Sequence, residues 1–212
     1  RQTLAEGNLG PVFAGIGASS VTGAIRHLSR QWGPVPPMRQ YRRHAVQGEL
    51  ALATGLGFIR TLISGEAQIR PAAAWMLCDA SRSGFGVASP VMDPEICRVG
   101  VLVGAHLGEV GRWVLALVRR VRSSEQGGAA VGLQTISSEP VPVLLDDGSR
   151  SWSGILCDPV VRGRGLRIAC EPGAMRSTRP VFAKLGGRMV KLQPGRAVVS
   201  GPGYQIVECT LL

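Results

Sequence analysis

The sequence predicts a mainly β fold in which an antiparallel β-barrel is followed along the chain by a second small barrel or sandwich. Hydrophobic residues make up 45% of the 212 residues and the mean hydropathy is +0.16, which supplies enough apolar side chains for a core. Many of them lie in short Val-, Leu- and Ile-rich segments, separated at close, regular spacing by Gly- and Pro-rich turns. Short strands with this punctuation are typical of barrels and sandwiches.

Residues 1–38 are predicted to form an accessory segment with one short helix and a Pro-rich linker. Apolar residues recur near helical spacing after a Ser-Ser pair that can cap a helix, namely Val21, Ile25, Leu28 and Trp32. "GPVPP" (33–37) then ends regular structure and forms a stiff linker. Because the chain begins with Arg1 rather than methionine, we expect a fragment or a processed product.

Residues 39–138 are predicted to form the first barrel. The segment "VQGELALA" alternates, with Val46, Leu50 and Leu52 on one face, as expected of a half-buried strand. In "GLGFIRTLISG" (55–65) the apolar residues recur at helical intervals, so we expect a short helix between strands. The further strands are predicted within "IRPAAAWMLCD", "FGVAS", "VGVLVGAHL", "WVLALVRRVR" and "AAVGLQTI". Trp75 and Trp113 lie in apolar strands and are expected in the core.

Residues 139–212 are predicted to form the second β-rich domain. Its expected strands are "VPVLL", "SGILCDPV", "LRIAC", "VFAKL", "RMVKLQ", "RAVVS" and "YQIVECTLL", with turns at "DDGS", "EPG" and "PGR". No internal repeat is evident.

The net charge of +10 permits an anionic partner without requiring one. Basic and acidic residues number 3 and 1 in residues 1–38, 11 and 7 in 39–138, and 10 and 6 in 139–212, so no segment is a basic tail. All basic residues except Lys184 and Lys191 are arginine, the residue that grips phosphates in a fork and stacks on bases.

The cysteines and histidines show no spacing typical of a metal site or a disulfide framework. Five widely spaced cysteines without a CxxC pair favour a reducing compartment, and hence a cytoplasmic location. No G-x-S-x-G, P-loop or HExxH motif is present, so we expect no enzyme, and no apolar run is long enough to span a membrane.

Two motifs remain. "MRQYRRHAV" contains Arg39 and Arg43 as R-x-x-x-R, and "CDASRSGFG" contains Asp79, Ser81 and Gly84 as D-x-S-x-x-G at the end of an apolar strand. Each is weak alone, because Arg39 and Arg43 can be a solvated linker and Asp79 and Ser81 can close a hairpin as an Asx-turn. Their order, spacing and strand context over residues 39–138 resemble the PilZ domain family, which binds cyclic di-GMP.

The resemblance implies a role for each motif residue. Arg39 and Arg43 would donate to phosphate and to guanine O6 and N7, Asp79 and Ser81 would accept from the guanine polar edges, and Gly84 would form the turn. The ligand would clamp the N-terminal linker onto the barrel and reorient attached segments. Many family members carry a basic residue where this chain has Met38, so we expect one ligand molecule per domain.

Two other function classes stay open. A basic barrel that binds RNA or single-stranded DNA would explain the charge, but only 5% of the residues are aromatic and no aromatic–basic stripe is present, which argues against nucleic acid. The second open class is a PilZ-shaped protein that binds no ligand and serves as a scaffold for protein interactions. We expect another protein or domain to be the output partner, but the sequence does not identify it. The sequence also does not decide whether the chain forms a homodimer.

Overall fold

A computed structural model of the chain describes residues 41–68, 75–108, 111–123, 127–176, 179–185 and 187–212, together with Ile25, Arg26 and Ser29. The chain divides into two compact units, Arg1–Arg42 and Arg43–Leu212. Ile25, Arg26 and Ser29 are helical, as the sequence predicts, while the rest of that helix, the linker at 33–37 and Arg39 lie outside the described residues.

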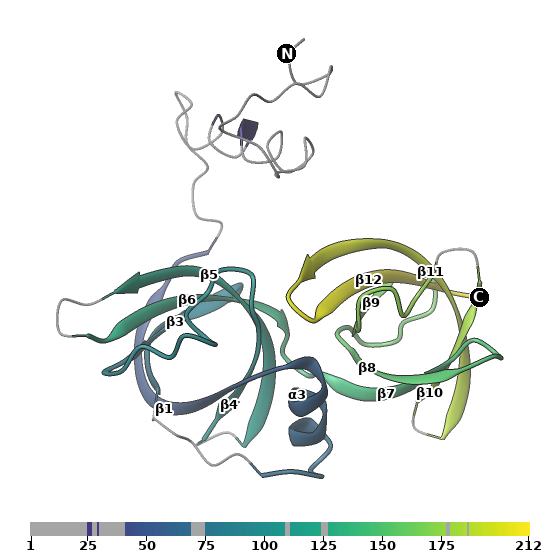
Figure 1. The fold of residues 1–212 in the computed structure, drawn as a ribbon, viewed down its shortest axis with the longest axis horizontal. Helices are drawn as coiled ribbons and strands as arrows, with labels where there is room; N and C mark the ends of the chain where they lie inside the picture. The colour runs from purple at the N-terminus through teal and green to yellow at the C-terminus, as the bar shows by residue number, and fades with distance from the viewer. Residues whose placement is uncertain are drawn as a thin grey trace. The chain divides into compact units, whose positions relative to one another are not determined.

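The first half of the larger unit is a closed antiparallel barrel (Figure 1). Its strands are β1 (His44–Thr54), β2 (Trp75–Ser81), β3 (Gly84–Ser89), β4 (Leu102–Leu107), β5 (Arg112–Ser123) and β6 (Ala129–Ser137), in the spatial order β1-β2-β3-β6-β5-β4. Every predicted strand of this half is present. Strand β3 pairs with β6 rather than with β4, so residues far apart in sequence become neighbours.

The second half is also a closed antiparallel barrel. Its strands are β7 (Val141–Asp146), β8 (Ser151–Leu156), β9 (Leu166–Cys170), β10 (Val181–Leu185), β11 (Arg188–Gly201) and β12 (Tyr204–Leu211), in the order β10-β11-β12-β9-β8-β7. The chain is therefore mainly β with two barrels, as its strand spacing predicts, and the choice between barrel and sandwich is settled in favour of the barrel.

The helix predicted between strands is α3 (Leu56–Ile63), which buries Ile59 and Leu62. It follows Gly55, whose φ of 83° turns the chain out of β1. Helix α3 lies against β1 and β4 of the first barrel and against β7 and β8 of the second (Figure 1). Within the described residues no helix is long and apolar enough to cross a membrane.

One predicted boundary in the second barrel is wrong. "RMVKLQ" and "RAVVS" were expected as two strands separated by a turn at "PGR", but β11 runs through Pro194 and Gly195 without interruption. The ladder with β12 shifts register between Pro194 and Ala197, and again between Ala197 and Val199. A bulge accommodates a proline that has no N–H to donate, so the strand bends here instead of ending.

A shared core joins the two barrels. Strand β5 is buried on both faces from Val114 to Val118: Val114, Ala116 and Val118 point into the first barrel, while Leu115 and Leu117 point away from it. The outward side chains pack with α3 and with the second barrel in one cluster: Ala53, Ile59, Leu62, Leu102, Leu115, Leu117, Ile136, Ile155, Cys157, Ala169, Tyr204 and Ile206. Trp75 is in the first barrel's own core, as predicted, and Trp113 packs against the shared core.

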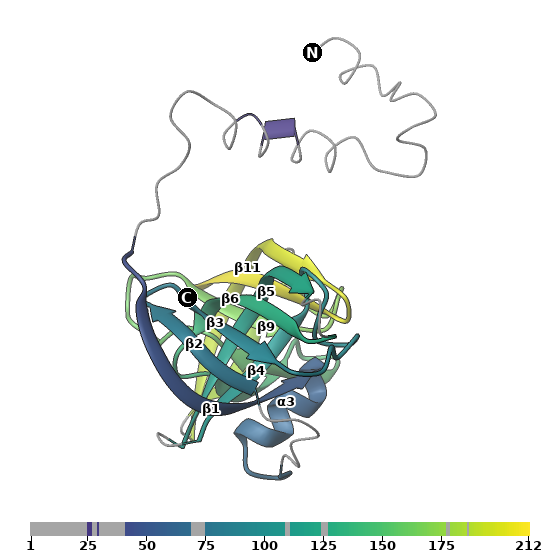
Figure 2. The same cartoon turned by 90° about the vertical axis from the view of Figure 1, so that its left-hand side faces the viewer.

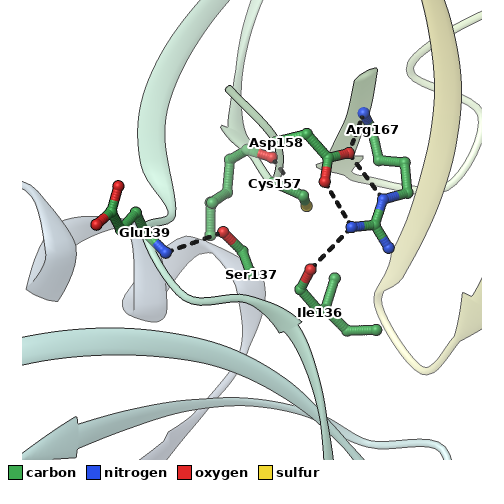
Figure 3. A network of polar contacts seen from close by, with 7 residues as sticks. Ile136, Ser137, Glu139, Cys157, Asp158 and Arg167 are labelled. Carbon is green, nitrogen blue, oxygen red and sulfur yellow. Dashed lines mark hydrogen bonds and ion pairs between the residues drawn. The ribbon is translucent and has the colours of Figure 1, made fainter. Parts of the chain in front are cut away.

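Polar contacts surround the shared core. Arg167 of β9 donates to both carboxylate oxygens of Asp158 and also to the backbone oxygen of Ile136 in β6, at 3.0 Å (Figure 3). The hydroxyl of Tyr204 in β12 donates to the backbone oxygen of Gly100 in the first barrel, at 2.8 Å. In each contact a side chain of the second barrel donates to a main-chain carbonyl of the first half, and these hydrogen bonds help to fix the orientation of the two barrels.

Candidate functional site

The first barrel brings the two sequence motifs together. Arg43 lies immediately before β1, whose first residues pair with the end of β2, with Ala45 opposite Asp79. The Nη1 group of Arg43 donates to Oδ1 of Asp79, forming an ion pair between residues 36 positions apart. The two side chains are 28% and 34% exposed, so they are held in place by the barrel and remain accessible from outside.

Asp79 faces the outer surface of the barrel and lies over Gly86. Phe85 and Val87 point into the barrel core, so Gly86 between them faces outward, and it pairs with Asp79 across β2 and β3. A Cβ at Gly86 would lie 2.9 Å from Oδ1 of Asp79. The absence of a side chain at this position is what lets the carboxylate lie flat against the sheet.

Ser81 and Gly84 form the turn between β2 and β3. The Ser81 hydroxyl donates to the backbone oxygen of Gly84 at 3.0 Å and so closes the hairpin. A Cβ at Gly84 would lie 2.1 Å from the backbone oxygen of Leu133, so only glycine allows β6 to approach this closely. Of the two residues that an Asx-turn would use, Ser81 does serve the turn, whereas the carboxylate of Asp79 is directed to Arg43.

The far side of this surface is formed by residues that no motif in the sequence singles out. Gly86 pairs with Gly132 of β6, and Gly132 pairs with Arg120 of β5, so Asp79 and Arg120 stand at the two ends of one cross-strand row. The Arg120 side chain lies over Gly132, with Nε 3.7 Å from where a Cβ would be. In the sequence this row is marked only by two glycines, Gly86 in "FGVAS" and Gly132 in "AVGLQTI". That they are neighbours becomes visible only when β3 pairs with β6.

A groove lies next to this row on the same face of the sheet. Two residues along β3 from Gly86, a second cross-strand row runs over β2, β3, β6 and β5 and consists of Met76, Ala88, Ala130 and Arg122. They line a cavity of about 550 Å³ together with the ends of β3 and β6. Figure 2 shows the four strands side by side on one face of the barrel.

The exposed face of β5 is strongly basic. Arg119, Arg120 and Arg122 are all exposed, and Arg119 donates to Oε1 of Gln134 on β6 at 2.7 Å. The face therefore has a floor of glycine and alanine, a carboxylate paired with an arginine along β2, and arginines along β5. Such a surface offers charges of both signs to an anionic ligand, and the Asp79 and Arg120 side chains cover the glycines between them.

Metal ligands do not cluster in the described part of the chain, and two of the cysteines there are deeply buried. No group of three or more His, Cys, Asp or Glu side chains there is placed to hold a metal ion. Burial raises the pKa of Cys157 to about 12 and that of Cys209 to about 12, which removes both thiols from chemistry near neutral pH.

Four of the five residues singled out by the sequence, Arg43, Asp79, Ser81 and Gly84, belong to the described part of the first barrel, and the fifth, Arg39, lies outside the described residues. The fold places Arg43 in contact with Asp79 and sets Ser81 and Gly84 in the adjoining turn. Comparisons with known protein families, with curated proteins and with solved structures find no match.

Proposed function

We propose that the chain is a receptor for cyclic di-GMP and that residues 39–138 form a PilZ-like domain. The observation that carries the proposal is the ion pair between Arg43 and Asp79, which unites two motifs that are separate in sequence. The contact brings the second motif arginine and the motif aspartate to one place on the outer surface of the barrel.

The chemistry of the surface suits this ligand. Cyclic di-GMP carries two anionic phosphodiesters and two guanines, each with O6 and N7 acceptors on one edge and N–H donors on the other. Arg43 can donate a fork to phosphate or to O6 and N7, and Asp79 can accept from the N–H edge. The Asp79 and Arg120 side chains cover Gly86 and Gly132, so a base would reach the backbone there once these two side chains turn from the sheet to the ligand.

Binding would exchange the ion pair for ligand contacts. An exposed pair of this kind contributes only about 0–1 kcal/mol to stability, so opening it costs little. Arg39 would add a second guanidinium, and the linker would be drawn onto the barrel. The clamped state gains population only through the ligand's higher affinity for it, and the N-terminal segment is the part of the chain that would be reoriented.

The test is isothermal titration of cyclic di-GMP into the full chain and its variants. Wild type is expected to bind with micromolar or tighter affinity and to saturate at one molecule per chain. Arg43→Ala and Asp79→Asn are each expected to weaken binding by roughly tenfold or more, because each removes a charge-assisted hydrogen bond. Arg42→Ala is the matched control: it removes the same charge from the neighbouring residue, which the motif does not require, and affinity should change little.

Other outcomes would point elsewhere. No heat and no thermal shift in wild type would refute the receptor, and saturation at two molecules would refute the single-ligand expectation. Strongly salt-dependent affinity for oligonucleotides of any sequence would favour a basic nucleic-acid-binding barrel. Capture of a protein partner that is indifferent to cyclic di-GMP would favour a ligand-free scaffold. Cleavage near residues 33–43 that the ligand leaves unchanged would argue against the clamp.

A further inference from the structure

A second cavity lies at one end of the second barrel. Because the strands alternate in direction, the turn after β7 and the loop after β9 emerge at the same end. The described residues of this turn and this loop line a cavity of about 350 Å³, a size typical of small-molecule sites, which often occupy the mouths of barrels. Its walls include Asp147 and Arg150 from the turn, Trp152 of β8, Arg176 and Arg179 from the loop, and Val181 of β10.

The cavity is positively charged. Three guanidinium groups and one carboxylate line it, which gives a net charge of +2 (three positive less one negative). The side chains of Arg176 and Arg179 form no ion pair or hydrogen bond with any described residue, although the two residues are joined through their backbones at 3.3 Å. Asp147 forms no ion pair with either arginine; its Oδ1 accepts from the Ser149 backbone N–H, the Ser149 hydroxyl and the Arg150 N–H of its own turn.

Arg150 is held in position across the cavity. Its Nη2 group donates to the backbone oxygen of Ala174 at 3.1 Å, and its Cζ lies 5.2 Å from the centroid of the Trp152 ring. The turn after β7 and the loop after β9 are thereby tied together. A guanidinium fixed by stacking and by one nitrogen keeps its other N–H groups oriented for a ligand, with less side-chain entropy left to lose on binding.

Trp152 adds an unsatisfied donor. The indole Nε1 is buried and has no acceptor among the described residues. A buried N–H without a partner is costly, and in native structures most such groups are paired. Trp152 lines the cavity, and its Nε1 is closed off from solvent, so a ligand would reach this N–H only after the side chains around the ring shift.

We propose that this cavity binds a small molecule bearing a phosphate monoester. A phosphate dianion matches the net charge of +2, and its oxygens accept from the forks of the arginines that line the cavity. The cavity admits the phosphate with one small organic group, such as a pentose. This site is in the opposite barrel from Arg43 and Asp79, and its existence does not depend on cyclic di-GMP binding.

The test uses ribose 5-phosphate and inorganic phosphate as probes, with ribose as the uncharged control, at fixed low ionic strength. Saturable binding of ribose 5-phosphate at one site is expected by calorimetry. The double variant Arg176→Ala/Arg179→Ala is expected to weaken it by roughly tenfold or more. Arg162→Ala/Arg164→Ala is the matched control: it removes the same charge from the loop between β8 and β9, which emerges at the other end of the barrel, and affinity should be retained.

A spectroscopic readout places the ligand. The indole N–H resonance of Trp152, identified by its loss in Trp152→Phe, should move when the phosphate binds. If ribose 5-phosphate binds more tightly than inorganic phosphate, the natural ligand is an organic phosphate. If the two bind with equal affinity, free phosphate is the occupant of the same site. Absence of saturable binding, equal weakening by the two double variants, or an indole resonance that does not move would each overturn the proposal.

Discussion

Gly84 and Gly86 are two residues apart on β3 but are glycine for different reasons. At Gly84 a Cβ would meet the backbone oxygen of Leu133 at 2.1 Å, and a backbone atom of a paired strand cannot move aside cheaply. At Gly86 a Cβ would meet the end of the Asp79 side chain at 2.9 Å, and a side chain on the outer surface can rotate away. The first glycine therefore serves the fold and the second serves the surface.

This difference predicts opposite outcomes for two alanine substitutions. Gly84→Ala is expected to destabilise the chain by roughly 3 kcal/mol, at the upper end of overpacking costs. Gly86→Ala is expected to stay within about 1 kcal/mol of wild type, but to move the carboxylate of Asp79 and weaken cyclic di-GMP binding. Urea unfolding and calorimetric titration measure the two effects. A Gly86→Ala variant that binds normally would remove Asp79 from the ligand site.

Arg43 and Asp79 can be recognised in the sequence as residues of two motifs, but their contact cannot. An arginine before a strand and an aspartate at a strand end are visible in the letters. Their meeting depends on β1 pairing with β2 in one particular register, and the opposing Arg120 depends on β3 pairing with β6. Those pairings are set by closure of the barrel, which no local pattern encodes.

At the scale of the element, two carboxylates organise the turn between β7 and β8, and Asp146 accepts from the Gly148 N–H at 2.6 Å and from the Ser151 hydroxyl. Asp147 accepts from the Ser149 hydroxyl at 2.6 Å, the Ser149 N–H at 2.9 Å and the Arg150 N–H at 3.0 Å. These hydrogen bonds, that of the Ser149 hydroxyl first, lower the pKa of Asp147 to about 2. The same turn carries Arg150 into the cavity of the second barrel.

A pH dependence follows for this turn. The pKa of Asp147 is lower in the folded chain than the ordinary value of about 4, so its stabilising contribution is complete above that value and is lost as pH falls from about 4 to about 2. Ser149→Ala should raise the pKa of Asp147 toward the ordinary value, measured by carboxyl carbon NMR titration. Ser153→Ala, an exposed serine of β8, is the control; equal midpoints in the two variants would contradict the assignment.

Among the elements, the strands were predictable and one boundary was not. Alternating or continuous apolar runs between Gly and Pro residues located the strands of both barrels, and helical spacing located α3. Pro194 and Gly195 carried the usual signal for a turn. The local sequence could not show that β11 pairs with β10 on one side and β12 on the other, and that a bulge absorbs the proline.

At the scale of the molecule, both barrels depend on the same buried side chains. Leu115 and Leu117 of β5 pack outside their own barrel, with Ile155 and Ile206 of the other, and all four are almost fully buried. In sequence this double burial reads only as an unbroken apolar run in "WVLALV". The run predicts a strand covered on both faces, but it does not say that the cover is another barrel.

The shared core predicts one cooperative unfolding transition for Arg43–Leu212. Leu117→Ala in the first barrel and Ile206→Ala in the second should each cost roughly 2–5 kcal/mol and should lower the same Tm. Scanning calorimetry checks this, with equal calorimetric and van't Hoff enthalpies expected. Two separate transitions, each moved by only one of the variants, would contradict the joint core.

The shared core also limits how recombination can divide the gene. A recombination event that cut the gene between β6 and β7 would give each half a closed barrel, but each would carry an uncovered apolar patch: Leu115, Leu117 and Ile136 on one, Ile155, Tyr204 and Ile206 on the other. Exposed patches of this kind promote aggregation. Shuffling should therefore pass the two barrels on as a pair, whereas residues 1–38, which belong to a separate compact unit and precede the arginine motif, can be exchanged for another segment.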